Sequence, residues 1–413
     1  MASHGVARSA RRELTASEKK QELSRIASYR NLVSQVQERY LANDHTSAAL
    51  TLTSTLLSQN PEFYTIWNYR RQILLSVFAT ELSAPPHPAS PSSTSPSASP
   101  SLTAAQREIS LLIREDLHFL LPLQRYNPKV YWLWNHRSWL LGQATEHLPT
   151  EVAMGFWREE LGLVEKMLGR DERNFHGWGY RRVVVGAVEE LRLRELVRAA
   201  RGKGGDGGGQ GEGEDGTQGG QVGKEMDEDK ERELKKQASL AQQEFEYADR
   251  MVRANLSNFS AWHHRLVQIY RLLEGKDNGD GERKRMFDKE LELVTEGLWV
   301  CTGPKDQSLW FYHLDLMATL DPEAREEIQI LKDLRKEGRR GYVERQMEAI
   351  KEILEDNEDC KWIYQALLDL AQLYKKIGGE VDTEEMRSWL DTLEKLDPLR
   401  KNRWMDLRRN LDL

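Results

Sequence analysis

Cysteine is scarce in this chain, with only Cys301 and Cys360 among 413 residues. Two cysteines cannot build a disulfide framework, and no His or Asp stands near either at the spacing of a structural zinc site. No apolar run approaches the ~20 residues that span a bilayer, and no signal peptide is recognisable. These absences predict a cytoplasmic protein that has no transmembrane segment and binds no metal of its own.

Charge of one sign and β-favouring segments are also missing. Lys and Arg number 59 and Asp and Glu 66, so the formal net charge is only −7 and both signs are mixed. No basic patch of the kind that binds nucleic acid is visible, which excludes that partner class. Apart from Val183–Val185, runs of β-branched residues are nearly absent, and helix-forming Glu, Leu, Lys and Arg are abundant. The composition predicts an all-α protein.

Tryptophan, by contrast, is plentiful, and five of the twelve belong to a sequence motif that occurs five times and is called the phrase below. In its fullest form the phrase is Asn-Pro, five residues, Trp, two residues, Arg, and its copies span 60–70, 127–137, 171–181, 255–265 and 303–313. An internal repeat of this kind decides the architecture before any single residue is interpreted. The repeated pairs are Trp67 and Arg70, Trp134 and Arg137, Trp178 and Arg181, Trp262 and Arg265, and Trp310 with His313 in place of Arg.

Each copy is typical of a helix start, because the residue seven before Trp is Asn, Asp or Gly and Pro follows it in three copies. We therefore expect helices to begin at 60, 127, 171, 255 and 303. About twenty residues before each Trp lies another apolar-periodic stretch. These stretches are 47–57, 109–121, 152–168, 240–252 and 287–300. The repeating unit is thus a helical hairpin, and stacked hairpins build an α-α superhelix.

Two low-complexity stretches interrupt the repeat, one rich in Ser and Pro at 83–103 and one rich in Gly and acidic residues at 202–233. Removing them brings every interval between repeat Trp residues to between 44 and 52, which fits paired-helix repeats. We expect both inserts to be disordered, and also a flexible basic tail at 1–12. The remainder, 13–413, is expected to form one helical-repeat domain, with a divergent sixth hairpin opening at Asn357 and closing near Leu396.

With these phrases in view, the chain resembles the α-subunits of protein prenyltransferases, and most closely that of Rab geranylgeranyltransferase, also called type II geranylgeranyltransferase. It resembles the short form, without immunoglobulin-like or leucine-rich-repeat domains. The resemblance implies a right-handed, crescent-shaped solenoid that wraps around a separate β-subunit. The shared α-subunit of farnesyltransferase and type I geranylgeranyltransferase is the alternative within the family. The segments that carry the resemblance are 67–71, 127–129, 171–182, 262–265, 306–313 and 396–400.

The resemblance also implies a reaction. A geranylgeranyl group passes from geranylgeranyl diphosphate to C-terminal cysteines of Rab GTPases, which a Rab escort protein presents. Zinc and the isoprenoid pocket are expected on the β-subunit, so this chain alone should be inactive. In the family, the lysine of the second repeat contacts the diphosphate. The matching residue is Lys129, and Tyr131 stands beside it.

Plainer interpretations stand beside these. Without the family, Lys129 is a solvated Lys at a helix start, and the repeated Trp and Arg residues serve the fold. The adjacent His263 and His264 point in different directions on a helix, which argues against a metal site. His4, in the basic tail, is a speculative zinc ligand on the partner. A non-catalytic helical-repeat scaffold is the alternative outside the enzymes.

Overall fold

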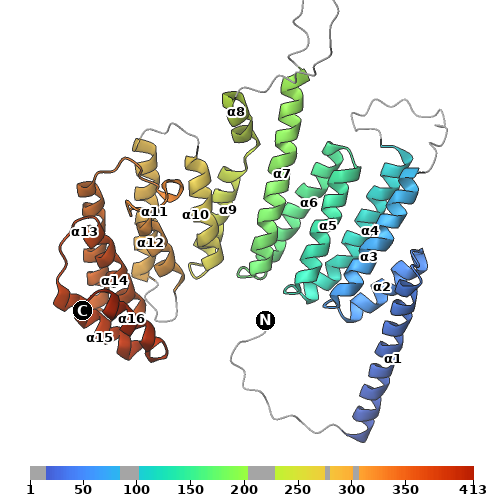
Figure 1. The fold of residues 1–413 in the computed structure, drawn as a ribbon, viewed down its shortest axis with the longest axis horizontal. Coiled ribbons are helices and arrows are strands. Elements are labelled where there is room, and N and C mark those ends of the chain that lie inside the picture. Colours follow the sequence, from blue (N-terminus) through green and yellow to red (C-terminus); the bar gives the residue numbers. More distant parts are fainter. Residues whose placement is uncertain (1–14, 84–101, 203–227, 275–279, 301–306) are drawn as a thin grey trace, which may run out of the picture. The chain divides into compact units, whose positions relative to one another are not determined.

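The computed structural model describes residues 15–83, 102–202, 228–274, 280–300 and 307–413, and every regular element within these ranges is a helix (Figure 1). In chain order the first eight helices are α1 (Ala16–Leu41), α2 (Ser47–Gln59), α3 (Tyr64–Ser83), α4 (Ala104–Tyr126), α5 (Tyr131–His147), α6 (Thr150–Leu168), α7 (Phe175–Gly202) and α8 (Glu228–Ala238). They are followed by α9 (Ala241–Ala254), α10 (Phe259–Leu273), α11 (Asp280–Val300), α12 (Ser308–Ala318), α13 (Lys336–Glu355), α14 (Lys361–Lys376), α15 (Thr383–Leu396) and α16 (Lys401–Asn410), with short 3₁₀ turns at Glu326–Ile328 and Pro398–Arg400.

The helices form two compact units, one extending to Met167 and including His176–Leu191, the other made of Leu168–Phe175 and the chain from Arg192 onward. In the first unit, α1 packs on the hairpin α2/α3, and α4/α5 and α6 with the start of α7 follow. In the second, the pairs are α9/α10, α11/α12, α13/α14 and α15/α16. The expected fold of stacked helical hairpins is confirmed, and each predicted upstream stretch lies in the first helix of its hairpin.

The Asn residues of the phrase end one helix rather than begin the next, so the predicted helix starts were wrong. Asn60, Asn127 and Asn255 are the C-terminal caps of α2, α4 and α9. The Asn127 amide Nδ2 donates to the carbonyl of Leu123 at 3.1 Å, and the same carbonyl accepts from the Asn127 backbone N–H at 2.8 Å, so the side chain reinforces the end of α4. The Asn255 Oδ1 accepts from the backbone N–H of Ser257 at 2.9 Å, which makes an Asx turn. The second helices α3, α5, α7 and α10 begin four residues later, and Gly303 lies outside the described residues.

The repeated Trp closes this turn from the other side. Its indole Nε1 donates to the backbone carbonyl six residues earlier, which explains the fixed distance between Asn-Pro and Trp. Trp67 donates to Pro61 at 2.9 Å, Trp134 to Pro128 at 2.9 Å and Trp262 to Leu256 at 2.8 Å. All five repeat Trp residues are buried, and these three indoles join the turn to the hairpin core. Nε1 of Trp310 has no hydrogen-bond partner among the described residues.

Two further copies of the turn are present toward the C-terminus. In the sixth, Asn357 joins α13 to α14, and the Tyr364 hydroxyl takes the place of the indole by donating to the Glu358 carbonyl at 3.0 Å. A seventh, partial copy joins α15 to α16, where the buried Trp404 stands seven residues after Asp397 but its indole Nε1 has no hydrogen-bond partner among the described residues. The expected sixth hairpin was therefore misplaced by one helix, and the seventh was missed although Asp397-Pro398 and Trp404 have the spacing of the phrase.

The second low-complexity stretch is narrower than its composition suggested. Helix α8 begins at Glu228, inside the expected insert at 202–233, and buries Leu234 and Ala238. Glu and Lys, which dominate this helix, are strong helix formers, so a charged composition was a poor sign of an insert. The first insert is bounded by α3 and by Thr103, whose hydroxyl caps α4. The tail at 1–12 with His4, and the ranges 84–101 and 203–227, lie outside the described residues.

None of the helices in the described ranges combines the length and the hydropathy that crossing a membrane requires.

Candidate functional site

A buried Arg follows each of four repeat Trp residues by three positions, and three of these Arg residues bind an acid on the first helix of the next hairpin. Their side chains are 3–4% exposed. The Nε–O distances are 2.8 Å from Arg70 to Asp116, 2.6 Å from Arg137 to Glu160 and 2.7 Å from Arg265 to Glu290. Arg181 is buried as well. Arg137 and Arg265 each bind both oxygens of their carboxylate, whereas Arg70 donates twice to one oxygen of Asp116. Such charge-assisted pairs in a dry interior are strongly oriented, so each one sets how two successive hairpins stack.

Each of these acids has a second partner, two positions after a repeat Trp. The same carboxylate therefore binds an Arg of the preceding hairpin and a Tyr or His on the second helix of its own hairpin. The distances are 2.7 Å from His136 to Asp116, 2.8 Å from Tyr180 to Glu160 and 2.6 Å from Tyr312 to Glu290. We call Asp116, Glu160 and Glu290 the shared acids.

The pKa values of these groups indicate a structural role. Burial alone would raise the pKa of Asp116, but Arg70 and His136 outweigh it and lower that pKa to about 2. Burial and the neighbouring Glu160 raise the pKa of Tyr180 well above its usual value. At neutral pH the acid is thus ionised and the phenol keeps its proton. Neither Asp116 nor Tyr180 is poised to exchange protons, which agrees with a role in holding successive hairpins together.

The fifth copy keeps the contact without the charge. His313 replaces the Arg, and on the next hairpin Gln346 takes the position of the shared acid, with Nε2 and Oε1 2.8 Å apart. His313 is fully buried, and burial lowers its pKa to about 4 although the bond to Gln346 opposes the shift. Both members of the pair have changed together, which avoids a buried unpaired carboxylate.

This buried histidine should make stability depend on pH. Between about pH 6.5 and pH 4 the unfolded chain binds a proton at His313 that the folded chain does not, so stability falls as pH falls through this window, by about 3 kcal/mol in total. His313→Asn should remove that part of the slope. Urea unfolding at pH 7 and pH 4.5 measures it, with the exposed His118→Asn as control. Equal pH slopes in the wild type and His313→Asn would contradict the assignment.

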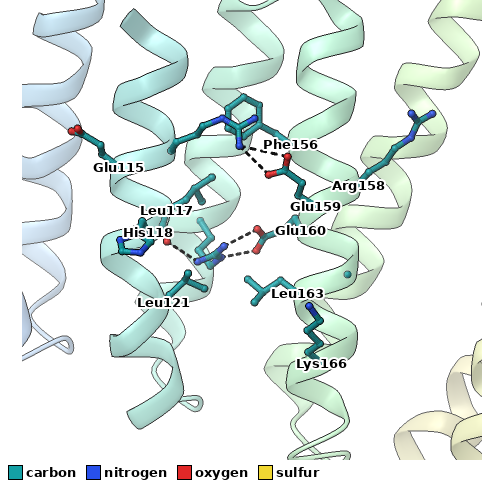
Figure 2. A pocket seen from close by; sticks show the side chains of 13 residues that line it. Glu115, Leu117, His118, Leu121, Phe156, Arg158, Glu159, Glu160, Leu163 and Lys166 are labelled. Carbon is teal, nitrogen blue, oxygen red and sulfur yellow. Dashed lines mark hydrogen bonds and ion pairs between the residues drawn. The ribbon is translucent and has the colours of Figure 1, made fainter. Parts of the chain in front are cut away.

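A cleft of about 730 Å³ lies between α4 and α6, and Glu160 is among its lining residues (Figure 2). The buried pair of Arg137 and Glu160 lines it, while the exposed Arg114 binds Glu159 at 3.2 Å and stacks over Phe156. A comparable cleft of about 690 Å³ lies between α9 and α11 over Arg265 and Glu290. Both clefts are grooves between successive first helices, and neither is lined by Lys129 or Tyr131.

Lys129 and Tyr131 lie at the turn between α4 and α5, near the N-terminal ends of the second helices α3, α5 and α7. Lys129 is exposed, and Tyr131, the first residue of α5, is 51% exposed. The ring of Tyr131 lies 6.1 Å from that of His176, and Trp132 stacks on Tyr64 at 5.4 Å. We call this group of five the turn surface. It presents a cation, a hydroxyl and aromatic rings, which suit an anionic group joined to an apolar one.

One further side chain of the turn surface carries a pKa shift. Burial lowers the pKa of His176, against the opposing effect of Glu62. The imidazole is therefore neutral at physiological pH and can offer a hydrogen bond or an apolar face. Sequence reasoning had not singled out His176, Tyr64 or Trp132; the positions two and three residues before each repeat Trp were the available signal.

Among the described residues, no group of three or more His, Cys, Asp or Glu is placed to hold a metal ion. His264 is buried against Glu244 at 2.9 Å, whereas the ring of its neighbour His263 lies 6.4 Å from that of Phe259. Cys360 is buried, and burial raises the pKa of its thiol, so it is a poor nucleophile.

Comparison with known proteins places these features in a family. The model of the protein prenyltransferase alpha subunit repeat matches residues 46–77, 113–144, 157–188 and 241–272, which hold the first four hairpins with a described repeat Trp. Among similar proteins are those called geranylgeranyl transferase type-2 subunit alpha. The protein from Saccharomyces cerevisiae is 30% identical, over 98% of each chain. That from Schizosaccharomyces pombe is 28% identical over 95% of this chain and 93% of its own length.

Two further comparisons, one with a longer protein and one with a solved structure, point to the same kind of subunit fold. The human geranylgeranyl transferase type-2 subunit alpha is 29% identical over 71% of this chain, which corresponds to 38% of the human protein. Among solved structures, a chain of Candida albicans protein geranylgeranyltransferase-I complexed with GGPP aligns with a TM-score of 0.50 and 18% identity, over 92% of this chain and 89% of that one. At this identity the structural likeness speaks for the fold alone.

Proposed function

We propose a function from the premise that this chain belongs to the family of geranylgeranyl transferase type-2 alpha subunits. The chain is the α-subunit of a heterodimeric prenyltransferase and supports a β-subunit. The enzyme transfers geranylgeranyl from geranylgeranyl diphosphate to C-terminal cysteines of Rab GTPases, which an escort protein presents in the cytoplasm. The observation that carries this proposal is the likeness to the yeast subunit along 98% of both chains.

The chemistry divides between two chains. A cysteine sulfur forms a bond to C1 of the prenyl group while the bond from C1 to the diphosphate oxygen breaks, so negative charge moves from sulfur to the leaving group. Zinc on the β-subunit, which the family resemblance implies, would supply the thiolate by binding the sulfur. Among the described residues of this chain, no group of three or more His, Cys, Asp or Glu is placed to hold an ion.

The leaving group is where this chain contributes. Lys129 is exposed on the turn surface, where a cation can meet the diphosphate at a partner's active site. The buried Arg residues cannot do so, because each is already held by a shared acid or by the interior. Tyr131, half exposed beside Lys129, adds a hydroxyl that can donate to the same anion.

Co-expression with candidate β-subunits tests the proposal. We expect prenyl transfer to Rab only from the heterodimer and only with escort protein present. Transfer to short C-terminal Cys-a-a-X peptides without escort would instead identify the shared α-subunit of farnesyltransferase and type I geranylgeranyltransferase. If no prenyltransferase β-subunit binds, the chain is a non-catalytic scaffold.

A further inference from the structure

Arg71 follows the buried Arg70 on α3 but reaches toward α5. Its Nη2 donates to Oδ1 of Asn135 at 2.7 Å, and its Nε donates to Nδ1 of His136 at 3.3 Å. The guanidinium also lies over the ring of Trp139, 5.4 Å from its centre. Partial burial lowers the pKa of Arg71. Within the described residues no carboxylate pairs with it, so its hydrogen bonds to neutral groups define its role.

These bonds have a fixed direction, because a guanidinium can donate but cannot accept. Asn135 must therefore turn its oxygen to Arg71, which leaves its Nδ2 facing the hydroxyl of Tyr131 at 3.3 Å. The Tyr131 oxygen accepts this bond, and its own proton is available to a different acceptor. Arg71 likewise makes Nδ1 of His136 an acceptor, so the histidine donates from Nε2 to the buried Asp116 at 2.7 Å.

We infer that Arg71 and Asn135 are positioning residues that hold the Tyr131 hydroxyl as a hydrogen-bond donor toward the diphosphate leaving group. This inference rests on the proposed function. As the bond from C1 to the diphosphate oxygen breaks, negative charge grows on the phosphate oxygens, and a donor oriented beforehand stabilises that charge without reorganisation. The proton stays on Tyr131 throughout. The two hydrogen bonds from Arg71 to Asn135 and from Asn135 to Tyr131, which we call the relay, orient this proton.

The matching place in the preceding hairpin lacks this arrangement. Asn68 follows Trp67 as Asn135 follows Trp134, but Asn68 is exposed and donates to no tyrosine in the described part of the chain. Tyr64, the counterpart of Tyr131, packs its ring on Trp132 instead. Asn68 is therefore a matched control for any effect of changing Asn135.

The test uses the heterodimer and single-turnover transfer of geranylgeranyl to Rab with escort protein. Tyr131→Phe keeps the ring and removes the hydroxyl, and we expect a rate lower by roughly tenfold or more, the effect of one hydrogen bond to a charged group. Asn135→Asp keeps the shape and gains an ion pair with Arg71, but the carboxylate accepts from Tyr131 and turns its proton inward. We expect this variant to fall to the rate of Tyr131→Phe with an undiminished melting temperature.

Combining the two changes separates orientation from charge. Tyr131→Phe with Asn135→Asp should be no slower than Tyr131→Phe alone, because the hydroxyl is already gone. A wild-type rate for Asn135→Asp, or a further fall in the combined variant, would overturn the inference. Asn68→Asp adds the same charge one repeat away and should keep the wild-type rate. If Lys129→Ala slows transfer while Tyr131→Phe does not, the function stands and the relay fails.

Discussion

Replacing Lys129 by Ala should slow geranylgeranyl transfer by the heterodimer roughly 10²–10³-fold in single turnover, the usual effect of removing one preorganised donor from a developing anion. Lys129 is exposed in the turn between α4 and α5, so its truncation leaves the hairpin core untouched. The melting temperature and the affinity for the β-subunit should therefore change little. Lys129→Arg keeps the charge on a longer, branched group and should recover part of the rate.

The third repeat supplies the matched control for this substitution. Arg173 stands two residues after Asp171 as Lys129 stands two after Asn127, and it is also exposed. Arg173→Ala removes an equivalent charge from a neighbouring turn and should leave the rate within about twofold. If Lys129→Ala turns over as fast as the wild type in an active heterodimer, the diphosphate is not stabilised from this position.

Replacing Arg137 by Ala should cost about 3–5 kcal/mol of folding free energy, because it leaves the buried carboxylate of Glu160 without its cation. The pair is bidentate, at 2.6 and 2.7 Å, and joins two successive hairpins. Tyr180 alone would remain bound to Glu160. Urea unfolding followed by circular dichroism measures the loss, and the variant's midpoint should drop well below that of the wild type.

Two controls separate buried charge from lost packing. Arg137→Met together with Glu160→Leu removes both charges and should recover most of the stability, since apolar replacements of buried pairs are often neutral. Arg114→Ala breaks the exposed pair with Glu159, which lines the same cleft, and should cost less than about 1 kcal/mol. Arg137→Ala unfolding at the same urea concentration as Arg114→Ala would show that the buried pair does not hold the hairpins together.

The spacing of the phrase predicted the hairpins because Trp and apolar residues recur with the period of a buried helix face. It misled about the turn, because Asn suits a helix end as well as a helix start. The carbonyl that accepts the indole of Trp67 is also invisible in sequence, since every residue has one. Only the six-residue separation from Pro61, repeated across copies, carried that information.

The shared acids could have been found and were not. Asp116 and Glu160 each lie 18 residues before a repeat Trp and Glu290 lies 20 before Trp310, a spacing nearly as regular as that of the Arg residues. In sequence, however, a charged residue on a helix is taken as exposed, and burial becomes evident only when neighbouring hairpins stack. Lys129 is the opposite case, because Glu62 and Arg173 hold its place in other copies and nothing local distinguishes it.

The turns that an indole closes have a bearing on where this chain tolerates extra length. Between Asn60 and Trp67 an added residue would part the indole from its carbonyl, whereas a residue added between one hairpin and the next lies outside this bonded turn. Both long inserts of the chain fall in those links, after α3 and after α7. Closing a longer flexible link costs little, about 0.6 kcal/mol for each doubling. Reporter proteins or affinity handles therefore belong after Ser83, at the end of α3 opposite to Tyr64 and the rest of the turn surface.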